Sequence, residues 1–280
     1  MTCFFPQELY GIIGWPLSQS LSPLIHNTGF QTLQIPGVYL AWPLPPERLA
    51  DFVTNLEIYR VRGLSITIPH KQAVMPLLKN ISDGARLAGA VNTLYWREDV
   101  ICGDNTDVTG FLAPLANYPG MRLPQTRVLL LGAGGAAHAA AAGLTLSGCR
   151  SVIVTSPGNK RQYELANRFD FTPVSWDDRY KYEADLIINT TPLGMYGREE
   201  GKTAYDFALA PGHVKGVAYD MVYNPLQTRF LREAETCGWR TVPGLAMFFA
   251  QGNAQFHLWT GRNLPEEARL ALSSALNKTV

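Results

Sequence analysis

The sequence has 280 residues, 46% of them hydrophobic and 17% charged, with a formal net charge of +1, which allows two domains and gives no reason to expect nucleic acid or an anionic membrane as a partner. The first residues lack the pattern of a signal peptide, and no apolar stretch is long enough to span a membrane. The four cysteines lack CxxC spacing and the five histidines lack metal-ligand spacing, so we expect a cytoplasmic protein with reduced thiols and no bound metal.

Short apolar runs alternate with helical patterns along the chain, which indicates βα units and a mainly parallel sheet. In the first half, the pattern predicts strands at residues 10–14, 38–42 and 63–68, helices at 22–30 and 46–56, a helix after Pro69, and a hairpin of 90–96 with 100–103. In the second half, it predicts strands at 128–131, 152–154, 186–189, 217–220 and 241–242, and helices at 110–116, 136–146, 160–169, 225–237, from 244 onward and at 265–276. The sequence therefore predicts an α/β fold.

Two short stretches, SITIPHK at 65–71 and GDNTD at 103–107, nominate Lys71 and Asp107 as a catalytic pair. Pro69 suits the first turn of a helix, and Lys71 would lie in that same turn, where a cation faces the positive end of the helix dipole. Such a position favours the neutral amine, which is the form that accepts a proton. The structural alternative is a solvated surface lysine.

The residues VLLLGAGGAA at 128–137 match the GxGxxG/A fingerprint of a dinucleotide-binding turn between a strand and a helix. The first glycine permits the tight turn, the second lets the backbone approach a pyrophosphate, and the third small residue lets the helix pack on the strand. The alternative is a tight turn that leads into an alanine-rich packing helix. The candidate cofactor contacts here are Gly132, Gly134, Gly135 and Ala136.

The residues after the second strand of this region bear on the choice of cofactor. An NAD site expects an acidic residue about 20 positions after the glycines, to bind the ribose, and none occurs between Gly132 and Tyr163. Ser156, Lys160 and Arg161 offer a hydroxyl and two cations instead, which suit a 2′-phosphate. NADP is therefore the expected cofactor, with NAD as the alternative.

Seven motifs in order resemble those of the shikimate dehydrogenase family, which includes quinate/shikimate dehydrogenases, over nearly the whole chain. They are GWPLSQSLSP at 14–23, TIPHK at 67–71, GAVNT at 89–93, GDNTD at 103–107, NTTPLGM at 189–195, YDMVY at 219–223, and residues 251–261. The resemblance implies a substrate-binding and catalytic domain at 1–108, completed by C-terminal helices at 246–280, and an NADP-binding Rossmann domain at 109–245, with the active cleft between them.

The resemblance also implies roles for individual residues, with Lys71 and Asp107 as the catalytic pair. The residues implied to bind substrate are Ser20 and Ser22 at its carboxylate, Thr67, Asn92 and Asp107 at ring hydroxyls, and Tyr223 and Gln251, which close the site. Further cofactor contacts are Thr191, Met221 and Gly244. From the residues alone, helix capping is the commoner role for the two serines, and Tyr223 is equally a core aromatic with a satisfied hydroxyl.

Three positions depart from the family pattern. Ser65 stands where an asparagine is usual, and its shorter side chain leaves more room near the substrate ring, so quinate becomes a second candidate substrate. The usual Asn-Arg-Thr signature after the second strand is replaced by Ser156-Pro157-Gly158, while Arg161 matches a second basic position. His138 stands where arginine is common. These changes keep NAD open as a cofactor.

The activity implied by the resemblance is reversible NADPH-dependent reduction of 3-dehydroshikimate to shikimate, in the pathway to chorismate and aromatic amino acids. Lys71 would deliver or relay the proton to the developing alkoxide, and Asp107 would orient it. The alternatives are a quinate/shikimate dehydrogenase with relaxed substrate or NAD use, a non-catalytic NADP-binding regulatory protein, and another two-domain dehydrogenase such as a folate enzyme. Only small-molecule partners are expected, with a monomer or homodimer.

Overall fold

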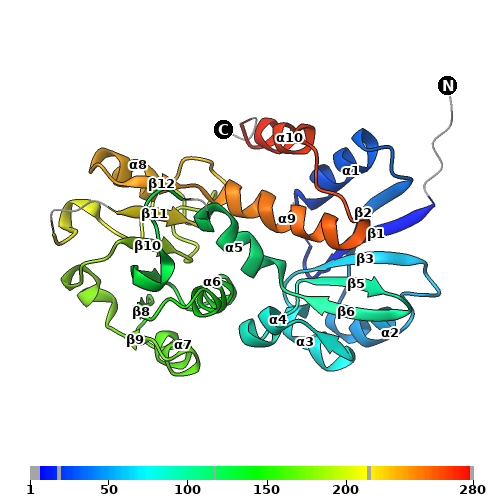
Figure 1. The fold of residues 1–280 in the computed structure, drawn as a ribbon, viewed down its shortest axis with the longest axis horizontal. Helices are drawn as coiled ribbons and strands as arrows, with labels where there is room; N and C mark the ends of the chain where they lie inside the picture. The colour runs from blue at the N-terminus through cyan, green and yellow to red at the C-terminus, as the bar shows by residue number, and fades with distance from the viewer. Residues whose placement is uncertain (1–6, 18–19, 117, 213–215, 278–280) are drawn as a thin grey trace. The chain divides into compact units, whose positions relative to one another are not determined.

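The computed structural model of the chain describes residues 7–17, 20–116, 118–212 and 216–277. These residues form two compact units (Figure 1). Unit 1 combines the chain up to Thr106 with the segment from Gln251 onward, and unit 2 is Asp107–Ala250. Within the described residues, no helix is long and apolar enough to cross a membrane.

Unit 1 is built on a six-stranded mixed sheet. Its strand order is β2 (Gly37–Pro43), β1 (Glu8–Gly14), β3 (Val61–Ile66), β5 (Thr93–Arg97), β6 (Val100–Asp104) and β4 (Asn80–Ile81). β1 pairs in parallel with β2 and β3, whereas β5 is antiparallel to both β3 and β6. β4 pairs in parallel with β6, so five of the six strands run the same way and only β5 of the predicted hairpin runs against them. The predictions of a mainly parallel sheet and of this hairpin are confirmed.

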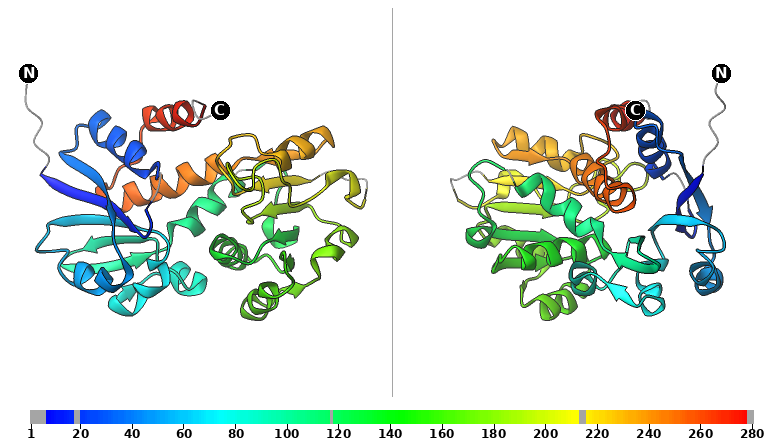
Figure 2. Two further views of the ribbon diagram at one scale, coloured as in Figure 1. Left: turned by 180° about the vertical axis from the view of Figure 1, so that it is seen from behind. Right: turned by 45° about the vertical axis from the view of Figure 1, so that its right-hand side comes forward.

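Helices cover both faces of this sheet, as Figure 2 also shows. α1 (Ser22–Thr32) packs against α10 (Glu266–Asn277) on one side. The other side carries α2 (Leu49–Thr54), which follows a 3-10 turn at Pro46–Arg48, and the short helices α3 (His70–Ala73) and α4 (Asp83–Ala88). The sequence analysis predicted neither the two-residue strand β4 nor the helix α4, because such short elements show no periodicity.

The C-terminal part of α9 (Gly244–Thr260) completes the core of unit 1. Trp259 Nε1 donates to the carbonyl oxygen of Leu94 at 2.9 Å. A side chain at Gly63 would lie 2.4 Å from the Trp259 ring, so only glycine gives the ring its place on β3. Phe256 packs on Phe30 of α1 with ring centroids 5.2 Å apart. The aromatic core of unit 1 therefore needs residues from both ends of the chain.

Unit 2 is built on a six-stranded, fully parallel sheet. Its order is β9 (Thr172–Pro173), β8 (Ser151–Thr155), β7 (Arg127–Leu131), β10 (Leu186–Asn189), β11 (Val217–Asp220) and β12 (Arg240–Val242). Numbered along the chain, this is the 3-2-1-4-5-6 order of the Rossmann fold, with the reversal between β7 and β10. The central strands are buried on both faces, which explains their continuous Val, Leu and Ile runs.

The helices of unit 2 are α5 (Thr106–Ala116), α6 (Gly135–Leu146), α7 (Arg161–Phe169) and α8 (Arg229–Thr236). α6 and α7 cover one face of the sheet, and α8 lies on the other (Figure 1). The helix predicted at 225–237 begins later than expected. Thr228 occupies its N-cap position, and the Thr228 hydroxyl accepts a hydrogen bond from Leu231 N.

Candidate active site

In unit 2, the carboxyl ends of β7, β10 and β11 bring Gly132, Asn189 and Asp220 to one edge of the sheet. In open α/β sheets, ligands bind outside these ends, where the strand order reverses. The glycine turn predicted from the sequence thus lies at the position where this fold binds its ligands.

The glycine turn has the shape that a pyrophosphate needs. Gly132 has φ +115°, and a side chain there would lie 2.3 Å from Thr190 Oγ1, so glycine is required by both conformation and space. At Gly134 and Gly135, by contrast, a side chain would meet no atom within 4 Å. No side chain caps the start of α6, so its first N–H groups remain for an anion. These residues fit the diphosphate of a dinucleotide.

The turn after β8 offers cations but not the predicted hydroxyl. Lys160 and Arg161 are exposed at the start of α7, and no residue in the described part of the chain pairs with either side chain. Ser156 is only 5% exposed and donates to Gln162 Oε1 at 2.7 Å. The Ser156 hydroxyl is therefore bound inside the protein, and the positive charge of this turn comes from its two basic residues.

A buried polar cluster organises the loops after β10 and β11. Asp220 is fully buried and accepts hydrogen bonds from Thr228 Oγ1 (2.5 Å), Val222 N (3.0 Å) and Asn189 Nδ2 (3.0 Å). Asn189 Oδ1 in turn accepts from the Thr191 hydroxyl at 2.7 Å. The sequence analysis missed Asn189 and Asp220 as individual residues; the available signal was a polar side chain at the end of each buried strand.

Burial raises the pKa of Asp220 to about 6, against an ordinary value of 3.8. Between these values, the folded protein holds a proton that the unfolded chain has lost, so stability falls as pH rises from 4 to 6. Asp220→Asn should remove this dependence. Relative to wild type, the free energy of unfolding of the variant should rise by about 2 kcal/mol over that interval. Urea unfolding at a series of pH values measures this difference, and parallel curves would contradict the prediction.

The remaining candidate residues of unit 2 are Met221 and Tyr223, which follow β11, and Gly244, which begins α9. Met221 N donates to Asn189 O at 2.9 Å. The ring of Tyr223 packs on Phe248 with centroids 4.6 Å apart, and burial raises the pKa of its hydroxyl. A side chain at Gly244 would lie 2.4 Å from Val222 O. The glycine at position 244 is thus explained by the close packing of the start of α9 on the loop that follows β11.

In unit 1, the two candidate serines lie at the start of α1. Ser20 Oγ accepts from Ser22 N at 3.2 Å, whereas the N-cap residue is Leu21 and no side chain caps the helix. Neither serine therefore occupies the cap position that the structural alternative assigned to them. Thr67 follows β3, and a side chain at Gly14 would lie 2.5 Å from the Thr67 methyl group. Glycine at position 14 thus gives Thr67 its space.

Lys71 is half-buried in α3, and its carbonyl oxygen accepts from Val91 N at 2.8 Å. α3 has only four residues, so Lys71 lies as close to its last carbonyls as to its first N–H groups. The expected effect of a helix dipole on Lys71 is wrong for this reason, because a single turn has no separated ends. Asp107 is half-buried in the first turn of the 11-residue α5, where a carboxylate is favoured.

Asn92 and Ser65 are both buried among polar groups of unit 1. Asn92 Oδ1 accepts from Thr106 N and from the Thr93 hydroxyl, each at 2.7 Å. Ser65 is 3% exposed, accepts from Tyr39 Oη at 2.7 Å and donates to Gln255 Oε1 at 2.9 Å. The Ser65 hydroxyl is thus held by protein groups on two sides. The sequence analysis did not single out Tyr39 or Gln255.

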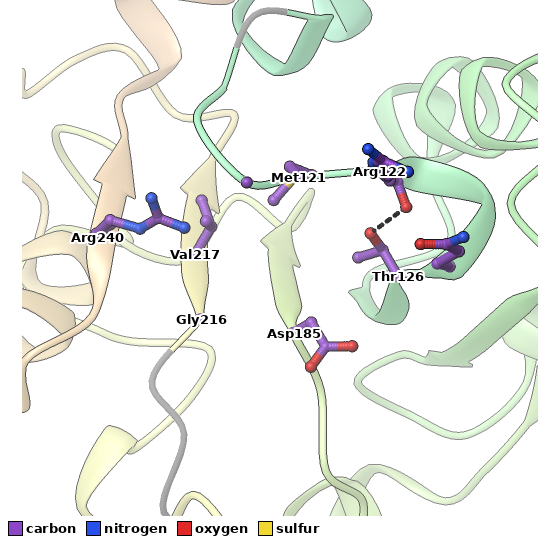
Figure 3. A pocket seen from close by; sticks show the side chains of 9 residues that line it. Met121, Arg122, Thr126, Asp185, Gly216, Val217 and Arg240 are labelled. Atoms are coloured by element: carbon purple, nitrogen blue, oxygen red, sulfur yellow. Dashed lines mark hydrogen bonds between the residues drawn. The ribbon is translucent and has the colours of Figure 1, made fainter.

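A hollow of about 440 Å³ lies at the opposite edge of the unit 2 sheet, beside the first residues of β10 to β12 (Figure 3). The carboxylate of Asp185 on its wall pairs with Arg127 at 2.8 Å. The guanidinium of Arg240 donates to Pro119 O at 3.0 Å. Asp185 and Arg240 thus bind other protein groups. The hollow also lies at the wrong end of the strands for a nucleotide.

The Rossmann strand order and the open glycine turn together define a dinucleotide-binding protein with a second α/β unit. A family model described as the shikimate dehydrogenase substrate binding domain matches residues 12–94. A shikimate dehydrogenase (NADP(+)) from Pelobacter propionicus is 48% identical over 97% of this chain and 98% of its own length. The chain belongs to the shikimate dehydrogenase family.

Two solved structures share the fold over nearly the whole chain. Shikimate 5-dehydrogenase from Thermus thermophilus, in complex with NADP(H) and shikimate, is 34% identical with a TM-score of 0.84, over 96% of this chain and 100% of its own. Shikimate 5-dehydrogenase from Listeria monocytogenes, in complex with shikimate and NAD, is 27% identical with a TM-score of 0.88, over 98% of this chain and 99% of its own. The resemblance found in the sequence motifs and the predicted α/β fold with a Rossmann domain are confirmed.

Proposed function

We propose that this chain is an NADP-dependent shikimate dehydrogenase, which interconverts 3-dehydroshikimate and shikimate. The observation that carries the proposal is the open glycine turn at Gly134 and Gly135, at the ligand-binding edge of a Rossmann sheet, in a chain of this family. As part of this proposal, we assign residues 1–108 with 246–280 to substrate binding and residues 109–245 to NADP binding, whereas the two compact units divide at Thr106 and at Ala250.

The proposed NADP site uses residues of unit 2 only. The turn of Gly132, Gly134, Gly135 and Ala136 would hold the diphosphate. Lys160 and Arg161 would hold the 2′-phosphate, supported by their exposure and lack of partners among the described residues. Further contacts are assigned to Thr191, Met221 and Gly244. When bound, NADP supplies hydride exchange with the carbon that bears the reacting oxygen.

The substrate site is assigned chiefly to unit 1. Lys71 Nζ accepts the hydroxyl proton during oxidation and returns it to the alkoxide oxygen during reduction, while the Asp107 carboxylate orients the amine and the adjacent hydroxyl. Binding of the substrate is assigned to Ser20, Ser22, Thr67, Asn92, Tyr223 and Gln251, with Ser65 beside them. We also infer that the protein acts in the cytoplasm as a monomer or homodimer.

A steady-state matrix of shikimate and quinate against NADP and NAD tests the proposal. Shikimate with NADP should give the highest kcat/KM. Oxidation of quinate would support the wider substrate range that the short side chain of Ser65 suggests, and efficient use of NAD would support the alternative cofactor. Purified protein that binds NADP but does not oxidise shikimate would favour the non-catalytic regulator instead.

The two exposed cations at the start of α7 provide a test of cofactor preference. Lys160→Ala and Arg161→Ala should each raise KM for NADP by about tenfold, which corresponds to about 1.4 kcal/mol of lost phosphate binding. KM for NAD should stay within about twofold, because NAD has no 2′-phosphate. Arg150→Ala serves as the control, since Arg150 is an exposed cation just before the opposite end of β8. Equal effects on both cofactors would contradict the assignment.

A further inference from the structure

A chain of buried polar side chains runs through unit 1. Its members are Tyr39 on β2, Ser65 on β3, Gln255 on α9, Thr93 on β5 and Asn92 just before β5, and each is at most 3% exposed. Buried polar groups are costly unless they are hydrogen-bonded. A chain that satisfies them across three strands and a helix therefore defines their relative positions.

The hydrogen bonds of this chain follow one another without a gap. Tyr39 Oη donates to Ser65 Oγ at 2.7 Å, and Ser65 Oγ donates to Gln255 Oε1 at 2.9 Å. Gln255 Nε2 donates to Thr93 Oγ1 at 3.0 Å, and Thr93 Oγ1 donates to Asn92 Oδ1 at 2.7 Å. Gln255 is the member that joins α9 to the sheet.

Two backbone groups fix the direction of every bond in this chain. The carbonyl oxygen of Asn92 can only accept, and it lies 3.3 Å from Gln255 Nε2, so the Gln255 amide must turn its oxygen toward Ser65. The N–H of Thr106 can only donate, and it bonds to Asn92 Oδ1 at 2.7 Å. The oxygen of the Asn92 amide is therefore held by the protein, and none of the described residues accepts from its NH₂ group.

We propose that Gln255 is a positioning residue for substrate binding. Through Thr93 it holds the Asn92 amide so that its NH₂ group donates to a substrate oxygen. Through Ser65 it ties α9 to β3, which places Gln251 one helical turn earlier on the same face. The inference rests on the proposed function, in which Asn92 and Gln251 contact shikimate.

Substitutions at Gln255 and Ser65 test this role in a double-mutant cycle. Gln255→Met keeps the length of the side chain and loses its hydrogen bonds, so the Kd of shikimate and its KM should rise by about tenfold while kcat stays within about threefold. Ser65→Ala should raise Kd by about threefold. Because both variants break the same bond, the double variant should show about tenfold and not about thirtyfold. Calorimetry gives Kd without NADP, and steady-state oxidation gives KM and kcat.

Trp96→Phe is the matched control. Trp96 lies on β5 three residues after Thr93, and its indole N–H donates to Val61 O at 2.7 Å outside this chain of bonds. The Trp96→Phe variant should leave KM for shikimate unchanged. Gln255→Glu, which keeps the acceptor for Ser65 but loses the NH₂ group, should also raise KM and answers the question if the methionine variant does not fold.

Three results would overturn the positioning role: a thirtyfold effect in the double variant, an unchanged KM in both Gln255 variants, or a loss confined to kcat. Wild-type protein is measured first in the same assay. If it does not oxidise shikimate with NADP, the proposed function fails. If it does and the Gln255 variants bind shikimate normally, only the positioning role fails.

Discussion

Lys71→Ala should lower kcat for shikimate oxidation by about 10²–10⁴-fold, the range that positioned proton transfer contributes in enzymes. The Kd of shikimate should change by less than about threefold, because alanine removes the proton acceptor but leaves the proposed carboxylate and hydroxyl contacts in place. Steady-state kinetics with NADP measure kcat, and calorimetry measures Kd.

Two controls make this result specific to the Lys71 amine. Lys79→Ala removes an exposed lysine of the same unit and should leave kcat unchanged. Added methylamine should partly restore turnover in Lys71→Ala, because a free amine can occupy the vacated space and accept the proton. Near-normal turnover in Lys71→Ala without added amine would remove Lys71 from the mechanism.

Gly134→Val should weaken NADP binding by about 100-fold or more while the protein remains folded, since a branched side chain would occupy the space that the diphosphate needs. The free energy of unfolding should change by less than about 1 kcal/mol, because no protein atom lies within 4 Å of the added Cβ. Fluorescence titration with NADPH and urea unfolding provide the two measurements.

Two other glycines serve as references for Gly134→Val. Gly132→Ala should destabilise the protein by about 2 kcal/mol, because its positive φ and the 2.3 Å approach to Thr190 leave no room for a side chain. Gly84→Val adds a side chain in equally open space in unit 1 and should leave NADP affinity unchanged. The assignment of the diphosphate to Gly134 would be contradicted if both Gly134→Val and Gly84→Val lost NADP binding, or if neither variant lost it.

The sequence predicted unit 2 better than unit 1, for a physical reason. Parallel strands buried on both faces have continuous apolar runs, and the predicted strands 186–189 and 217–220 match β10 and β11 in both bounds. In unit 1, the antiparallel pairing of β5 with β3 joins distant segments and has no local pattern. Helix length is also poorly marked, which is why the four-residue α3 was expected to carry a dipole.

Side-chain direction explains most of the differences at the candidate site. Motifs located the glycine turn, but no spacing shows that Ser156 turns inward to Gln162. Gln255 lies within a stretch already noted for its resemblance, yet its bonds to Ser65 and Thr93 cross more than 160 positions of sequence. Contacts of that range follow only from the folded sheet, so the polar chain in unit 1 was not predictable.

The division of the chain also sets the order in which its parts can be completed during synthesis. Unit 2 is one continuous stretch and has all its residues once Ala250 has left the ribosome. Unit 1 is begun first but lacks Phe256 and Trp259, whose rings pack on Phe30 and Gly63, until the C-terminal segment emerges. Its sheet therefore exposes an apolar face throughout the synthesis of unit 2, and this nascent intermediate is the one that chaperones would protect.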